Sequence, residues 1–166
     1  MTTHGTQNPG ETQAQRLERV YEEVAKLLRE PKVASRLGTA PGKDEWSAMQ
    51  TLGHMTEMIP YWLSHCRVLI AATGAPPTFG RTPGSPERLD GVARGAAARP
   101  DELLVQLRDE VRAAAGAIRK LSPAERSKRG VSPERGEVTV AEVLESFIVG
   151  HAEEHPAQLN AALRIQ

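Results

Sequence analysis

Two histidines one helical turn apart, His151 and His155, are the residues of this chain best suited to metal chemistry. A spacing of four residues on a helix puts both imidazoles on the same face, about 6 Å apart, close enough to share one ion. The apolar residues Leu144, Phe147 and Ile148 fall on that face, so we expect it to turn inward. A buried neutral imidazole needs a polar partner, and a divalent cation is one. The pattern predicts a metal site.

A third histidine, His54, is predicted to lie opposite this pair. It stands seven residues after Ser47, where a helix should begin, and His155 stands eight residues before the expected helix end at Leu163. These positions are about 10 and 12 Å from their helix ends, so antiparallel packing brings them level. His65 lies about 16 Å beyond His54, too far to share the ion, and is expected to be a core or pocket-lining residue. Three imidazoles leave a divalent ion with open coordination positions, as in catalytic sites.

Two side chains near the histidine pair are candidate catalytic residues. The zinc-protease pattern requires Glu directly after the first histidine, but Ala152 stands there, which excludes a thermolysin-like mechanism. Glu154 points about 60° to one side of His151 and could approach a bound water, unless it has a surface or supporting role. Gln158 follows His155 by one turn, and its alternative role is that of a buried amide that satisfies backbone groups.

Four helical segments are expected to carry these residues. Apolar residues recur at spacings of three and four between capping or breaking residues over Gln13–Glu30, Ser47–Ala72, Pro100–Leu121 and Thr139–Leu163. Pro60 and Pro156 should bend the second and fourth helices. We expect residues 1–12 to be a disordered segment and residues 13–166 to form one domain.

The stretches Thr73–Arg99 and Ser122–Val138 are predicted to be irregular, and the first is rich in Gly, Pro, Ser and Arg. A connection of that length lets the second and third helices run parallel, which predicts an all-α four-helix bundle with up-down-down-up order. Within the Thr73–Arg99 stretch, Arg81 and Arg88 are candidates to bind a carboxylate-bearing thiol cofactor at the bundle mouth. The alternative is a solvated, flexible connection.

Composition narrows the class of partner. The 166 residues include 21 basic and 21 acidic side chains, so the net charge is zero and gives no support to nucleic-acid binding. No apolar run reaches the roughly 18 residues that span a bilayer, and the polar first residues do not resemble a secretion signal, which predicts a cytoplasmic protein without membrane contact. The single cysteine, Cys66, is expected to be a small buried residue. A small-molecule substrate is expected, and the sequence leaves a homodimer open.

Several short motifs together resemble the DinB-like superfamily of four-helix-bundle metalloenzymes. They are Trp46-Ser47, Gly53-His54-Met55, Thr139-Val140, and the run from His151 through His155 to Gln158-Leu159. The resemblance covers nearly the whole chain from about Gln13. It implies that His54, His151 and His155 bind one divalent ion, zinc or nickel and sometimes iron. Pro156-Ala157, between the second ligand and Gln158, departs from common members.

Members of that superfamily include S-transferases and isomerases that use bacillithiol or mycothiol. The resemblance therefore implies a metal-dependent enzyme, either a low-molecular-weight-thiol S-transferase or a hydrolase. Its ion could lower the pKa of a bound thiol or water. One alternative is a non-catalytic stress-response module in which the ion ties the second helix to the fourth. Another is a helical bundle whose histidine cluster is incidental.

Overall fold

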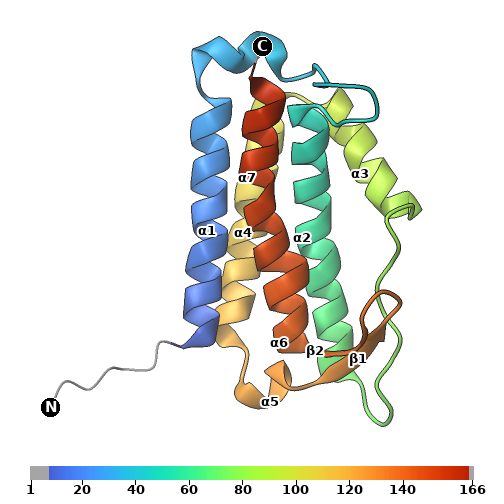
Figure 1. The fold of residues 1–166 in the computed structure, drawn as a ribbon. Helices are drawn as coiled ribbons and strands as arrows, with labels where there is room; N and C mark the ends of the chain where they lie inside the picture. Colours follow the sequence, from blue (N-terminus) through green and yellow to red (C-terminus); the bar gives the residue numbers. More distant parts are fainter. Residues whose placement is uncertain (1–7, 165–166) are drawn as a thin grey trace, which may run out of the picture.

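The computed structural model describes residues 8–164 and shows an all-α four-helix bundle with a β-hairpin at one end (Figure 1). The long helices are α1 (Pro9–Leu28), α2 (Ala48–Ala71), α4 (Pro100–Lys120) and a last helix composed of α6 (Val140–Val143), η2 (Leu144–Val149) and α7 (Gly150–Leu163). The short elements are η1 (Pro31–Arg36), α3 (Pro86–Ala97), α5 (Pro123–Arg126), β1 (Arg129–Ser132) and β2 (Gly136–Thr139). Figure 1 shows α1 and α7 running in one direction and α2 and α4 in the other, which confirms the predicted order.

Capping residues begin α2 and α6 where the sequence predicts. The Ser47 hydroxyl accepts a hydrogen bond from the Gln50 N–H, while the Gln50 amide oxygen accepts one from the Ser47 N–H. Thr139 and Glu142 form the same reciprocal pair at the start of α6. Each pair satisfies backbone donors that the first helical turn leaves free.

The start of α1 corrects the predicted boundary of the bundle. The helix begins at Pro9, not near Gln13, so residues 9–12 are helical although they were expected to be disordered. Asn8 caps the helix by accepting the Gly10 N–H, and Glu11 in the first turn pairs with Arg119 of α4 at 2.9 Å. A cap and an interhelical ion pair hold this polar turn in place without apolar burial. The rest of the predicted disordered segment, residues 1–7, lies outside the described residues.

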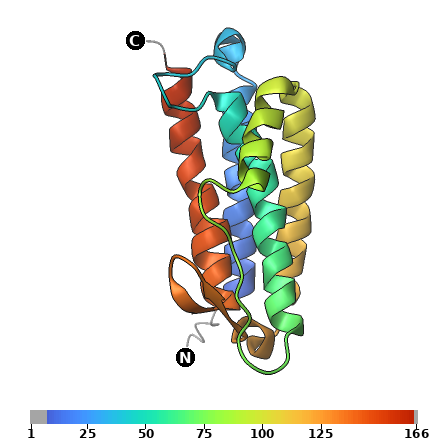
Figure 2. The same cartoon turned by 90° about the vertical axis from the view of Figure 1, so that its right-hand side faces the viewer.

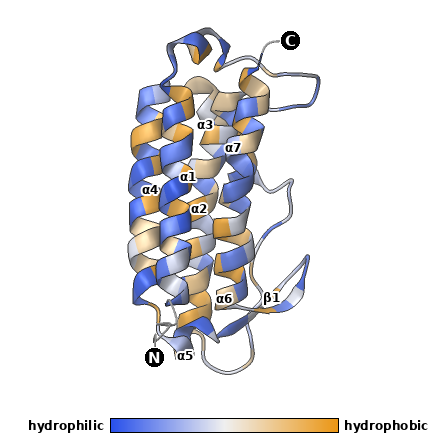
Figure 3. Ribbon diagram, turned by 60° about the vertical axis from the view of Figure 1, so that its left-hand side comes forward, coloured by the Kyte–Doolittle hydropathy of each residue, from blue (hydrophilic) through white to orange (hydrophobic). Residues whose placement is uncertain are grey.

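The core fills the space between the long helices. Figure 3 shows hydrophilic and hydrophobic bands alternating along α1 and α4, as expected for helices with one buried face. Leu17, Leu52, Leu107 and Ile148 have no exposed surface at all. Helices α2 and α7 stay helical on both sides of their internal prolines. No helix among residues 8–164 is long and apolar enough to cross a membrane.

The predicted irregular stretch Thr73–Arg99 contains a helix, α3, that packs closely against α2. Three glycines make this contact: Gly53 of α2 with Gly91 and Gly95 of α3. A Cβ atom on Gly53 would lie 2.8 Å from the Gly95 nitrogen, and one on Gly91 would lie 2.7 Å from the Glu57 Cβ. Glycine therefore marks a close approach of two backbones here, whereas in the sequence it suggested a loop.

The second predicted irregular stretch, Ser122–Val138, contains α5 and the β1–β2 hairpin. Gly136 has a φ of +69° at the turn, and β1 pairs with β2 from Arg129↔Thr139 to Ser132↔Gly136. The hairpin also holds the start of the long connection, because the Phe79 N–H donates to the Val131 carbonyl at 3.0 Å. Figure 2 shows that connection rising along α2 from the hairpin to α3. Two strands of four residues each are too short to show the alternation of apolar and polar residues by which strands are recognised in a sequence.

Candidate metal centre

The three predicted histidines meet between α2 and α7. One nitrogen from each of His54, His151 and His155 can be chosen so that all three lie within 4.8 Å of one another. The Nε2 atoms of His54 and His151 are 3.2 Å apart. The structure thus brings together residues that stand 97 positions apart in the chain.

Burial leaves two of these imidazoles with unpartnered nitrogens. His54 is 2% exposed and His155 is 4% exposed, while His151 is half-buried. The His155 Nδ1 donates to the Gln158 amide oxygen at 2.7 Å, which leaves the buried Nε2 of His155 with its lone pair and no hydrogen-bond partner. An orphaned basic nitrogen beside two other imidazoles is an arrangement that a metal ion would satisfy.

The same burial keeps the histidines neutral. It lowers the pKa of His54 to about 2 and that of His155 to about 4, and it lowers the pKa of His151 as well. The positive charge of Arg88 adds to the effect on all three, after burial. Only neutral imidazole has a lone pair to offer a metal, so the group is ready to coordinate one at neutral pH.

A wider turn precedes the histidine pair in the last helix. In η2 the helix is π-helical, and the Gly150 N–H donates to the Glu145 carbonyl, five residues earlier. A π-helical turn holds more residues than an α-helical turn, so it rotates the residues that follow it relative to a regular helix. The helix-wheel prediction assumed a regular helix. Single π-turns of this kind occur frequently at functional sites.

A buried ion pair next to His54 was not predicted. The Glu57 carboxylate lies 3.9 Å from the His54 Nδ1 and is held by both terminal nitrogens of Arg81, at 2.7 Å for Nη2. The Arg81 and Glu57 side chains are only 7% and 8% exposed, and the guanidinium stacks on the Tyr61 ring at 3.8 Å. The one signal for Glu57 in the sequence was its position three residues after His54, on the same helix face.

Arg88 lies closer to the histidines than its place in the predicted loop suggested. It stands in the first turns of α3, with its guanidinium 4.7 Å from the centre of the Trp46 ring. The Trp46 ring in turn lies 5.2 Å from that of His54, centre to centre. Trp46 therefore contacts both Arg88 and the histidine group.

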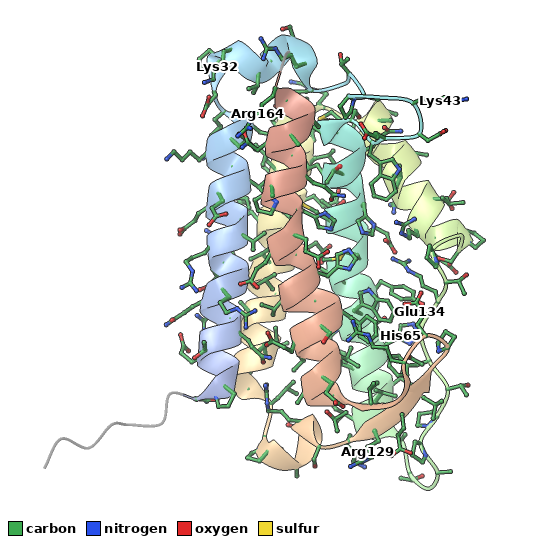
Figure 4. The ribbon with its side chains drawn as sticks, in the orientation of Figure 1. Lys32, Lys43, His65, Arg129, Glu134 and Arg164 are labelled. Atoms are coloured by element: carbon green, nitrogen blue, oxygen red, sulfur yellow. The ribbon has the colours of Figure 1, made fainter. Side chains whose placement is uncertain are left out.

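The remaining candidates lie further from the centre. Glu154 is exposed, and its negative charge opposes the lowering of the pKa of His151. His65 packs on the Tyr61 ring at 4.6 Å and lines a small pocket with Val131 and Ser132 of β1; it is labelled in Figure 4. Cys66 is 1% exposed, and burial raises the pKa of its thiol to about 12, as expected for a small core residue.

A cleft of about 980 Å³ is lined in part by Trp46 and Gln158, which contact His54 and His155. Its walls come from the segment before α2, from α2, from α3 and from the end of α7, and they are formed by Pro41, Asp44, Glu45, Trp46, Thr51, Arg88, Gln158, Ala161, Ala162 and Arg164. Gln158 both lines this cleft and bonds His155. The cleft thus reaches two residues that contact His54 and His155, although none of the wall residues is itself a histidine.

Known structures share this fold at low sequence identity. YfiT from Bacillus subtilis, described as a probable metal-dependent hydrolase with an unusual four-helix bundle topology, superposes with a TM-score of 0.76 at 16% identity over 98% of this chain and 90% of its own. The mycothiol-dependent maleylpyruvate isomerase gives a TM-score of 0.68 at 18% identity over 96% of this chain. This chain spans 63% of the length of that isomerase. No curated protein matches the chain significantly.

The family assignment rests on sequence as well as fold. The family model described as the DinB superfamily matches residues 16–159, which include the three clustered histidines, Glu57, Arg81, Arg88 and most of each long helix. That match covers most of the chain. This protein belongs to the DinB superfamily.

Proposed function

We propose that this protein is a metal-dependent enzyme that holds one divalent ion on His54, His151 and His155 and acts on a small molecule bound in the adjoining cleft. The observation that carries the proposal is the buried, unpartnered Nε2 of His155 beside two neutral imidazoles. Three imidazole donors suit zinc or nickel, and iron also accepts them. When bound, such an ion would supply Lewis-acid chemistry to a thiol, water or carbonyl group.

The surrounding residues support this role. Gln158 fixes the ring of His155 through its Nδ1, and the Glu57 carboxylate lies on the Nδ1 side of His54. A hydrogen-bonded partner such as Gln158 sets which nitrogen of the histidine faces the ion and orients the ring. Glu154 is an exposed carboxylate whose charge acts on His151, and we propose it as a proton-transfer group.

Two reaction classes follow from this site: transfer of a low-molecular-weight thiol and hydrolysis. The fold shared with YfiT supports hydrolysis, and the fold shared with the mycothiol-dependent isomerase supports thiol chemistry. The ligands also come from two different helices, which supports a non-catalytic module as the second candidate, with an ion that only ties α2 to α7.

The deciding experiment starts with elemental analysis of protein purified without a histidine tag. We expect about one divalent ion per chain, lost in His151→Ala/His155→Ala and retained in the control His65→Ala. The same preparations are then assayed for conjugation of bacillithiol, mycothiol, glutathione or coenzyme A to monochlorobimane and for hydrolysis of p-nitrophenyl acetate. Turnover that needs both metal and His54 supports an enzyme, bound metal without turnover supports the module, and no bound metal overturns both.

A further inference from the structure

We propose that the cleft recognises a small molecule with one anionic end, which the Arg88 guanidinium binds against the face of Trp46 while the rest of the molecule extends towards the histidines. The inference depends on the proposed function only in calling that molecule a substrate. The anion site itself is built from protein side chains and does not require the metal ion.

The first support is that the charge of Arg88 has no counter-charge in direct contact. Its Nη1 donates to the Pro83 carbonyl at 2.8 Å, its guanidinium lies over the Trp46 ring, and within residues 8–164 it forms no ion pair. The side chain is half-buried. Its pKa is lowered, first by burial and then by the charge of Arg81, so the cation is less well stabilised here than in water. A bound carboxylate or phosphate would supply the missing partner, and both fit the fork of a guanidinium.

Arg81 cannot take this role, although the sequence offered both arginines for it. Its two terminal nitrogens already hold the Glu57 carboxylate, and both side chains are more than nine-tenths buried. An anion would have to displace Glu57 from a buried pair, which would leave that carboxylate uncompensated. Arg81 is therefore already paired, and Arg88 is the arginine that can bind an anion.

The position of Arg88 links the anion site to the histidines. The Trp46 ring contacts both Arg88, with the guanidinium carbon 4.7 Å from the ring centre, and His54, at 5.2 Å between ring centres. Arg88 and Gln158 line the same cleft, and Gln158 holds His155. A molecule bound at Arg88 could therefore extend along the cleft towards Gln158, which holds His155.

The rest of the cleft selects for a single anionic end. Asp44 and Glu45 line it together with Arg88, and neither forms an ion pair within residues 8–164. Within residues 8–164 no ion pair joins either acid to Arg88, so neither is its direct counter-charge. A ligand with negative charge along its whole length would meet both carboxylates, and like charges at close range are unfavourable.

The test uses hexanoate, hexyl phosphate, adipate and the neutral hexanamide as probes with metal-free and zinc-loaded protein. Binding is followed by tryptophan fluorescence, because Trp46 lies under Arg88, and by calorimetry. We expect hexanoate or hexyl phosphate to bind, whichever anion the site prefers, and hexanamide and adipate to bind at least about tenfold more weakly. Arg88→Gln should weaken the preferred anion by about tenfold or more, and Arg88→Lys by less.

The control is Arg94→Gln, on the same helix but exposed, which should bind as the wild type does. Equal affinity of wild type and Arg88→Gln for both anions, or adipate binding as tightly as hexanoate, would overturn the inference. Thermal unfolding of each variant shows whether it is folded. If the protein binds no metal but metal-free protein still shows Arg88-dependent anion binding, the proposed function fails and the anion site stands.

Discussion

Two of the three histidines have a polar side chain near the ring nitrogen that points away from the cluster. The Nδ1 of His155 donates to Gln158, and the Nδ1 of His54 lies 3.9 Å from the Glu57 carboxylate. The hydrogen bond to Gln158 leaves the Nε2 of His155 to face the centre, whereas Glu57 lies beyond hydrogen-bond distance of His54. Residues that bind nothing themselves can therefore control how strongly the centre holds an ion.

Removing the Gln158 amide should weaken metal binding without unfolding the protein. Gln158→Ala leaves the His155 Nδ1–H without its acceptor, and loss of such a partner typically costs about 10- to 100-fold in metal affinity. Competition with a chromogenic chelator measures the effect. The control Asn160→Ala, two residues along α7, should leave affinity unchanged, and equal affinities for the two variants would refute the role of Gln158.

The Glu57–Arg81 pair should matter for stability far more than surface pairs do. Glu57→Gln leaves a buried guanidinium without its counter-charge, which should lower the free energy of unfolding by about 3–5 kcal/mol in urea titrations of metal-free protein. Glu137→Gln breaks a pair whose side chains are 58% and 50% exposed and should cost less than about 1 kcal/mol. Comparable losses for both variants would contradict this account.

Between elements, the contact of α2 with α3 depends on the absence of side chains. Gly95→Ala would put a Cβ 2.7 Å from the Gly53 Cα, so α3 must shift, and with it Arg88 and the wall of the cleft. We expect a loss of stability of about 1–3 kcal/mol, as for other overpacked sites, in chemical denaturation. Gly116→Ala in α4 meets nothing within 4 Å and should be neutral or stabilising by up to about 1 kcal/mol. A neutral Gly95→Ala would show that the helices do not need this close approach.

The contact of α2 with α7 should make metal-free protein sensitive to mild acid. Unfolded histidine takes up a proton below about pH 6.5, whereas in the folded protein the pKa is about 4 for His155 and about 2 for His54. Stability is therefore fully present above pH 6.5 and is lost as pH falls towards these values, because the unfolded state binds more protons.

Denaturant titrations with a chelator at pH 7.5 and 5.5 measure this loss above the range where most carboxylates titrate. His54→Gln should show a smaller difference between the two pH values than the wild type, because it removes one group with a lowered pKa. If His54→Gln leaves the stability difference between pH 7.5 and 5.5 unchanged, protonation of the buried His54 does not cause the loss of stability.

At the scale of the whole molecule, the proposed ion would join two helices through His54 and His151, which stand 97 residues apart in the chain. An ion that binds only the folded state stabilises it by mass action, by about 2.7 kcal/mol at a free concentration of 100 times Kd. Added zinc or nickel should therefore raise the melting temperature and chelator should lower it, as measured by thermal unfolding. His151→Ala/His155→Ala should respond to neither, and a wild type that also fails to respond would show that no ion supports the fold.

The sequence by itself determined the long helices, their order and the level at which His54 meets the pair on the last helix. These features depend on signals within a few residues, such as the capping pairs at Ser47 and Thr139 and the recurrence of apolar residues, together with the fixed rise of a helix. Contacts between distant segments decided the rest. Gly91 and Gly95 are helical because α2 offers a matching glycine, and Arg81 is occupied because Glu57, 24 residues away, faces it. Because Glu57 pairs with Arg81, Arg88 is left without a counter-charge. No local sequence pattern encodes this choice, since the free energy of a charge depends on which side chains the fold places around it.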